Sequence, residues 1–181
     1  LLPETMELTS QGVKTCVENG VNVKVLTKRA DFIDNFFGLL ASYGNFDEDQ
    51  YREHMAFGFT LTGHDELERG ASSNIERIGT MEELHNRGYR IFASIEPIVD
   101  FPSSMQMING SLPFCGLYKI GLMSGNGVTY DPVEAQIFLS ELQQLPGQPK
   151  IYLKNSLVRL LGVDRKTLPE NFVESNYNMF G

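Results

Sequence analysis

The sequence predicts an α/β fold with a mainly parallel sheet, and three observations lead to this prediction. The spacing of apolar residues switches repeatedly between a helical period and short strand-like runs. Most of the helical stretches open with a capping residue or close with glycine. The length of 181 residues, with 41% apolar and 21% charged, suits one globular domain. Strands that alternate with helices indicate a doubly wound sheet or part of a (β/α) barrel.

The first half of the chain carries two strand-like runs between amphipathic stretches. Asp31 is the expected N-cap of the second helix, and Ser73 with Glu76 forms a capping box that opens the third. In that third helix, Ile75 belongs to the expected apolar stripe, together with Ile78, Met81 and Leu84. The expected elements are helix 4–19, strand 21–28, helix 31–43, strand 55–62 and a helix from the capping box to Gly88.

The second half continues the alternation. Asp131, Pro132 and Glu134 supply an N-cap, a first-turn proline and a box residue for one of its helices. The expected elements are strand 89–96, a short helix 103–109, strand 117–123, a helix from Asp131 through Leu142, strand 150–153 and helix 155–161. We therefore expect the barrel-like unit to occupy residues 1–162 and residues 163–181 to form an irregular tail that wraps the surface or frays. Because the order opens with a helix that has no preceding strand, we expect the first βα units of a barrel to be absent and the chain to be a fragment.

Charge and cysteine content exclude several classes of function. The net charge of −8 leaves no basic footprint for a phosphate backbone, which disfavours nucleic-acid binding by this chain alone. Cys16 and Cys115 lie far apart and have no metal-type spacing. The apolar runs are too short for a membrane span or a signal peptide. A reducing, cytoplasmic compartment is the expected setting.

Candidate site residues are the small, hydroxylic and charged side chains at the strand ends, because ligands of parallel α/β proteins bind at the carboxyl edge of the sheet. Glu96 is the sharpest of them, since a carboxylate on a buried strand needs a partner or a ligand. A glutamate in solvent, or one paired with Lys28 or Lys154, is the alternative. The candidates are Lys28, Thr60, Thr62, Ser94, Glu96, Ser124 and Asn126.

Two loops have a weaker functional signal. The glycine-containing segment 124–127 lacks a full dinucleotide-binding pattern, so a plain turn is the favoured interpretation. His64 lies among acidic residues after the second strand, but no second histidine is near it in sequence, so a polar loop is favoured over a metal site. The sequence shows no Ser/His/Asp or Cys/His set.

An ordered series of segments resembles the later half of radical S-adenosylmethionine proteins, in the branch around spore photoproduct lyase and its phage-associated relatives. The resemblance spans roughly residues 5 to 162. It rests on Val25-Leu26-Thr27-Lys28, Phe59-Thr60-Leu61-Thr62-Gly63, Ser73-Asn74-Ile75-Glu76-Arg77-Ile78, Ala93-Ser94-Ile95-Glu96-Pro97-Ile98 and Tyr118-Lys119-Ile120-Gly121. The resemblance implies a partial, usually six-stranded (β/α) barrel in which this chain supplies the third to sixth strands, with the short strand 150–153 as a terminal addition.

The same resemblance implies a cofactor chemistry. A [4Fe-4S] cluster and S-adenosylmethionine would together generate a 5′-deoxyadenosyl radical in the whole enzyme, with the protein positioning the reactants. Lys28, with Thr60 or Thr62, would contact S-adenosylmethionine, and Arg77 would pair with its carboxylate. Ser94, Glu96, Ser124 and Asn126 would face the adenosine or the substrate. The cluster motif CxxxCxxC is not in this sequence, so we expect no bound cofactor and no activity from this chain alone.

Other interpretations stay open at this stage. Arg77 can instead lie on a solvated helix face. The chain can be a complete cluster-free α/β module for binding or interaction, or a hydrolytic or aldol-type barrel that uses Glu96 and Lys28. The edge left by missing strands would expose unpaired backbone groups, which predicts self-association. The substrate is not predicted.

Overall fold

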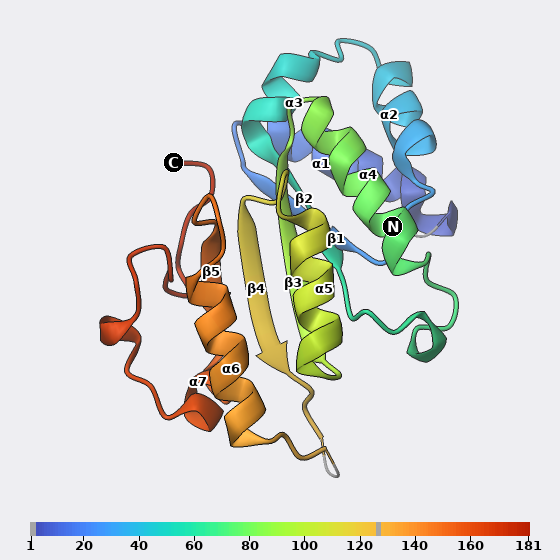
Figure 1. Cartoon of the computed structure of the whole chain (residues 1–181). Coiled ribbons are helices and arrows are strands. Elements are labelled where there is room, and N and C mark those ends of the chain that lie inside the picture. Colours follow the sequence, from blue (N-terminus) through green and yellow to red (C-terminus); the bar gives the residue numbers. More distant parts are fainter. Residues whose placement is uncertain (1–2, 126–127) are drawn as a thin grey trace.

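The computed structural model describes residues 3–125 and 128–181 and contains one sheet of five parallel strands. The strands lie side by side in the order in which they occur along the chain (Figure 1). They are β1 (Val23–Thr27), β2 (Met55–Thr60), β3 (Arg90–Ile98), β4 (Leu117–Leu122) and β5 (Lys150–Leu153). None of the helices in these two ranges has the length and apolar character that crossing a bilayer requires.

Helices precede, connect and follow the strands. They are α1 (Met6–Glu18), α2 (Ile33–Ser42), α3 (Glu48–His54), α4 (Asn74–Asn86), α5 (Phe101–Ser111), α6 (Pro132–Gln143) and α7 (Asn155–Leu161). Short 3-10 turns cover Pro3–Thr5, Asp65–Leu67 and Arg165–Thr167. The capping box of α4 and the aspartate caps of α5 and α6 are present, so these helices begin where side-chain oxygens satisfy the first free backbone N–H groups.

The helices all pack against the same face of the sheet. Residues such as Phe57, Ile95 and Ile120 point to that face and belong to one apolar core with residues of α1, α2 and α4 to α7. A sequential strand order with crossovers of one hand places every helix on one side, whereas a doubly wound sheet reverses its order and is covered on both sides. The chain is therefore a segment of a (β/α) barrel type of sheet, which decides between the two architectures that the sequence left open.

On the opposite face of the sheet, here called the open face, none of the described helices packs. Its side chains alternate along each strand with those of the core. The C-terminal segment covers its amino-terminal part, where Ala56, Phe92 and Leu117 pack with Val173, Tyr177, Met179 and Phe180. The same segment forms a bridge between Phe172 and Ile151 at the outer edge of β5. The tail expected to wrap or fray thus closes one end of the open face and leaves the carboxyl ends of the strands accessible.

Three local expectations were wrong. The helix expected from Asp31 begins at Ile33, and the Asp31 carboxylate pairs with Arg29 instead of capping it. Residues 48–54, where no element was expected, form α3 with Asp47 as N-cap. Ile75 is 81% exposed, because the buried face of α4 contains Arg77 in its place.

Candidate functional site

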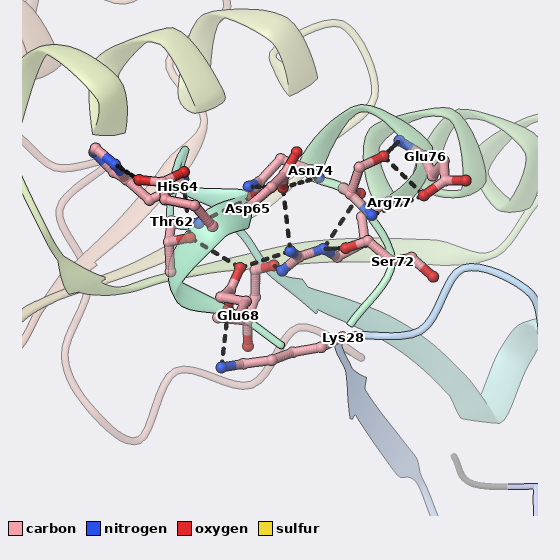
Figure 2. Close-up of polar contacts among 12 residues, drawn as sticks. Lys28, Thr62, His64, Asp65, Glu68, Ser72, Asn74, Glu76 and Arg77 are labelled. Carbon is pink, nitrogen blue, oxygen red and sulfur yellow. Dashed lines mark hydrogen bonds and ion pairs between the residues drawn. The ribbon is translucent and has the colours of Figure 1, made fainter. Parts of the chain in front are cut away.

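Glu68 forms the centre of a polar network at the carboxyl ends of β1 and β2 (Figure 2). It lies directly after the 3-10 turn that follows β2, and its side chain is only 4% exposed. Its carboxylate lies 2.9 Å from Lys28 Nζ and 2.6 Å from the guanidinium of Arg77, and it accepts a hydrogen bond of 2.9 Å from the Thr62 hydroxyl. The network joins β1, β2 and α4 through one buried acid.

The electrostatics of this network keep Glu68 ionised. Burial acts to raise the pKa of Glu68, but hydrogen bonds from Arg77, Lys28 and Thr62 outweigh burial, and the pKa lies below its usual value. Lys28 reaches the carboxylate from the surface, since 48% of its side chain is exposed. The Lys28 ammonium can therefore contact a ligand on its exposed side while it stays paired.

The position of Arg77 excludes one of the two alternatives considered for it. Its side chain is fully buried, not on a solvated helix face. Its guanidinium donates to the carbonyl oxygens of Thr60 and Ser72, at 2.5 and 2.8 Å, as well as to Glu68. In this conformation the carboxylate partner of Arg77 comes from the chain itself, so its role is to hold the end of β2 against α4.

A second group of polar side chains crosses the open face in one row. The strand register aligns Thr60 of β2, Ser94 of β3, Lys119 of β4 and Tyr152 of β5. Thr60 and Ser94 are each 6% exposed, and Lys119 and Tyr152 are partly buried. The Lys119 ammonium lies 5.2 Å from the centre of the Phe92 ring. The hydroxyls of the row and this ammonium form no hydrogen bond or ion pair with another residue in the described part of the chain.

Lys119 is electrostatically unusual within the row. Burial lowers its pKa, and the positive charges of Lys24 and Lys154 lower it further. No carboxylate of residues 3–125 or 128–181 offsets these effects. Lys119 therefore combines partial burial with a surplus of positive charge, in a chain whose net charge is −8.

Glu96 lies one row nearer the carboxyl ends, where it forms an ion pair with Lys154 across β4. The pair fits because Gly121 lies between the two side chains. A Cβ atom at Gly121 would come within 3.0 Å of both Glu96 Oε1 and Lys154 Cδ. Of the alternatives considered for Glu96, the structure contains the pairing with Lys154.

A cavity of about 410 Å³ opens beside the first two strands, and it connects the Glu68 network with the open face. Two of the candidate residues, Lys28 and Thr60, line it. So do the half-exposed Leu26 and the exposed Arg69. This volume lies within the range of small-molecule sites, which is roughly 300 to 1,000 Å³.

The remaining candidates do not join these groups. Ser124 is exposed beyond β4, and Asn126 lies outside the described residues. His64 contacts Glu66 and Asp100 at 2.7 and 2.5 Å, and these contacts raise its pKa. In the two described ranges, no three histidine, cysteine or acidic side chains are grouped as a metal site would require.

The two cofactors that the resemblance implies, S-adenosylmethionine and a [4Fe-4S] cluster, differ in how well they fit this chain. The cavity offers an ammonium, a hydroxyl and an apolar wall, which are groups that can bind the carboxylate, hydroxyls and adenine of S-adenosylmethionine. A [4Fe-4S] cluster does not fit this chain, since such clusters are held by cysteine thiolates and the sequence has two cysteines. Cys115 is buried, and burial raises the pKa of its thiol to about 12.

Comparison with known proteins identifies no relative: no family model, curated protein or solved structure matches the chain. The assignment of a function therefore depends on the geometry and on the sequence motifs.

Proposed function

We propose that this chain binds S-adenosylmethionine in the cavity beside β1 and β2, as the later strands of the partial barrel of a radical S-adenosylmethionine enzyme. The proposal goes beyond the expectation from the sequence, which was that the chain alone holds no cofactor, because the structure contains a cavity between two of the expected contact residues. One observation is the main support for this proposal. Lys28 and Thr60 are far apart in sequence and were both chosen as cofactor contacts, and they line the same cavity at the carboxyl edge of the sheet. The sequential strand order supports the barrel relationship, because such barrels bind ligands at that edge.

Each cavity residue has a defined task in this proposal. The Lys28 ammonium, already held by Glu68, binds the ligand carboxylate on its exposed side. The Thr60 hydroxyl, which has no partner in the described chain, bonds to a ribose or amino group. Leu26, 52% exposed, gives the adenine ring an apolar surface. When bound, S-adenosylmethionine supplies an activated 5′-carbon for one-electron chemistry, and the chain positions it and excludes water.

Titration of the ¹⁵N-labelled chain with S-adenosylmethionine tests the binding step. We expect saturable amide shifts at residues 26–28 and at Thr60. Thr60→Val keeps the shape of the side chain and removes only the hydroxyl, so we expect it to weaken binding several-fold without unfolding the chain. Lys166→Met, in an exposed 3-10 turn, is the matched control and should leave the affinity unchanged. Absence of saturable shifts at millimolar ligand would refute the proposal.

The enzymatic part of the proposal is tested on the complete product of the gene. We expect its reading frame to encode CxxxCxxC, and the reconstituted, oxygen-free protein to absorb broadly near 400 nm and to release 5′-deoxyadenosine with dithionite. A reading frame without such cysteines, together with a colourless protein, would leave only a cluster-free binding module.

A further inference from the structure

We propose that Ser94, Lys119 and Tyr152 form a second binding site on the open face, which takes the phosphate or carboxylate group of a small molecule. This site lies on β3, β4 and β5, whereas the cavity lies beside β1 and β2. Both are on the open face, where Thr60 of the cavity is the neighbour of Ser94 in the row. The second site does not depend on the binding of S-adenosylmethionine. In an enzyme of this architecture it is suited to the substrate.

The register places the three side chains side by side. Ser94 lies opposite Lys119, and Lys119 lies opposite Tyr152. Adjacent parallel strands are about 4.8 Å apart, so the three polar groups can converge on one ligand group. They are hydrogen-bond donors held on a rigid sheet, not on a mobile loop.

The free hydroxyl of Ser94 gives the first argument for a ligand. The residue is 6% exposed and its hydroxyl bonds to no group in the described part of the chain, but the oxygen atom is not sealed from solvent. A ligand oxygen can therefore reach this hydroxyl and replace the water that contacts it.

The charge of Lys119 gives the second argument. Lysine side chains are seldom buried without a counter-ion, and Lys119 has none among the residues of ranges 3–125 and 128–181. Glu96, which lies on the neighbouring strand β3 one row nearer its carboxyl end, is engaged by Lys154. The Lys119 ammonium lies over the Phe92 ring, and the charged groups that act on it, Lys24 and Lys154, are also positive. An anionic ligand would supply the missing negative charge.

The combination of groups selects the ligand class. An ammonium and two hydroxyls provide donors for an oxyanion but no carboxylate for a cation. Charge-assisted hydrogen bonds from lysine suit both phosphate and carboxylate. Tyr152 borders the site with an aromatic ring, which can cover an apolar part of the same molecule.

The test uses the chain labelled with ¹³C at lysine Cε, titrated with inorganic phosphate in one arm and acetate in the other. Sodium chloride keeps the ionic strength constant. We expect the Lys119 signal to shift saturably in at least one arm, and its titration midpoint to rise as the anion binds. The arm with the higher affinity identifies the preferred group.

Variants connect the shift to the site. Lys119→Met should lower the affinity about tenfold or more, and Ser94→Ala about threefold or more, as expected for charged and neutral hydrogen bonds. Ser94→Ala removes an atom without a partner, so it keeps the test valid if Lys119→Met unfolds. Lys166→Met is again the control and should bind as the unaltered chain does.

Two results would overturn the inference. One is a Lys119 signal that responds to neither anion more than to sodium chloride. The other is loss of S-adenosylmethionine binding in Lys119→Met or Ser94→Ala, because the row would then hold that molecule's own carboxylate. If S-adenosylmethionine does not bind at all while phosphate or acetate does, the proposed function fails and this site stands.

Discussion

Replacement of Arg77 by methionine tests whether the Glu68 network is the main polar support of the site. The variant fills similar space but removes the donors to Thr60, Ser72 and Glu68. It leaves a carboxylate whose side chain is 4% exposed with only Lys28 and Thr62 as partners. Breaking a buried ion pair by removing one partner costs about 3 to 5 kcal/mol of unfolding free energy. Because Lys28 still compensates part of the charge, we expect a loss of about 3 kcal/mol.

Lys28→Met is the matched comparison, because it removes the other cation of the same acid. The Lys28 side chain is 48% exposed, so water and salt screen its interaction with Glu68. Exposed ion pairs contribute about 0 to 1 kcal/mol. We therefore expect Lys28→Met to cost at most about 1 kcal/mol, clearly less than Arg77→Met.

Urea unfolding at pH 7, followed by far-ultraviolet circular dichroism, measures both variants. The double variant Arg77→Met with Glu68→Leu should recover most of the loss, since replacing a buried pair with apolar residues is often neutral. The reasoning is refuted if Arg77→Met stays within about 1 kcal/mol of the unaltered chain, or if Lys28→Met costs as much.

Three further predictions concern the rest of the fold. Gly58→Ala should lower stability by about 1 to 3 kcal/mol in thermal unfolding, because a Cβ atom would lie 2.1 Å from the Phe92 ring; an unchanged melting temperature would contradict this packing. Hydrogen bonds to Glu66 and Asp100 raise the pKa of His64, so its stabilisation is complete below its unfolded pKa of about 6.5 and is lost as pH rises through the higher folded value. Urea unfolding of His64→Asn should therefore differ from the unaltered chain at pH 5.5 and converge with it at high pH, and a constant difference would refute this role. No other described strand pairs with the outer edge of β1, so light scattering should detect concentration-dependent dimers, and a strictly monomeric chain would contradict this.

The alternation of strands and helices was predictable because each strand buries apolar residues on the core face and each helix buries one stripe. The element that the prediction omitted, α3, shows the limit of that signal. Of its seven residues only Tyr51 is buried, so no apolar stripe distinguishes it from a charged loop. It is held in place by its cap at Asp47 and by packing of Tyr51 beside Phe46.

The buried face of α4 was predicted incorrectly for a related reason. Its buried face contains Asn74 and Arg77, which no hydrophobic pattern assigns to a core. These residues are buried because acids from the preceding loop satisfy them: Asp65 accepts from Asn74, and Glu68 accepts from Arg77. The acids lie in and directly after the short 3-10 turn that follows β2, so periodicity cannot indicate that they face inward.

Part of the site followed from the sequence, because strand ends in parallel sheets are ligand positions. Lys28 and Thr60 were found in this way, and the cavity contains both. Lys119 was not chosen as a site residue, since it lies in the middle of a strand. Alternation there assigns a polar residue to one face of the sheet but does not show whether helices cover that face. A signal for it existed. Lys119 lies two positions before Gly121 on β4, so the two residues lie on the same face of the sheet.

The strand order explains why that signal matters. In a sheet covered by helices on both sides, alternate strand positions must all be apolar, because each face packs on a helix. Here the second face carries Thr60, Ser94, Glu96 and Lys119 at alternate positions of three adjacent strands. Polar residues in that pattern are tolerated only where no helix covers them, as on a barrel interior that binds ligands. Polar residues at every second position of adjacent strands can thus be recognised in the sequence, and they distinguish a barrel segment from a doubly wound sheet before the order of the strands is known.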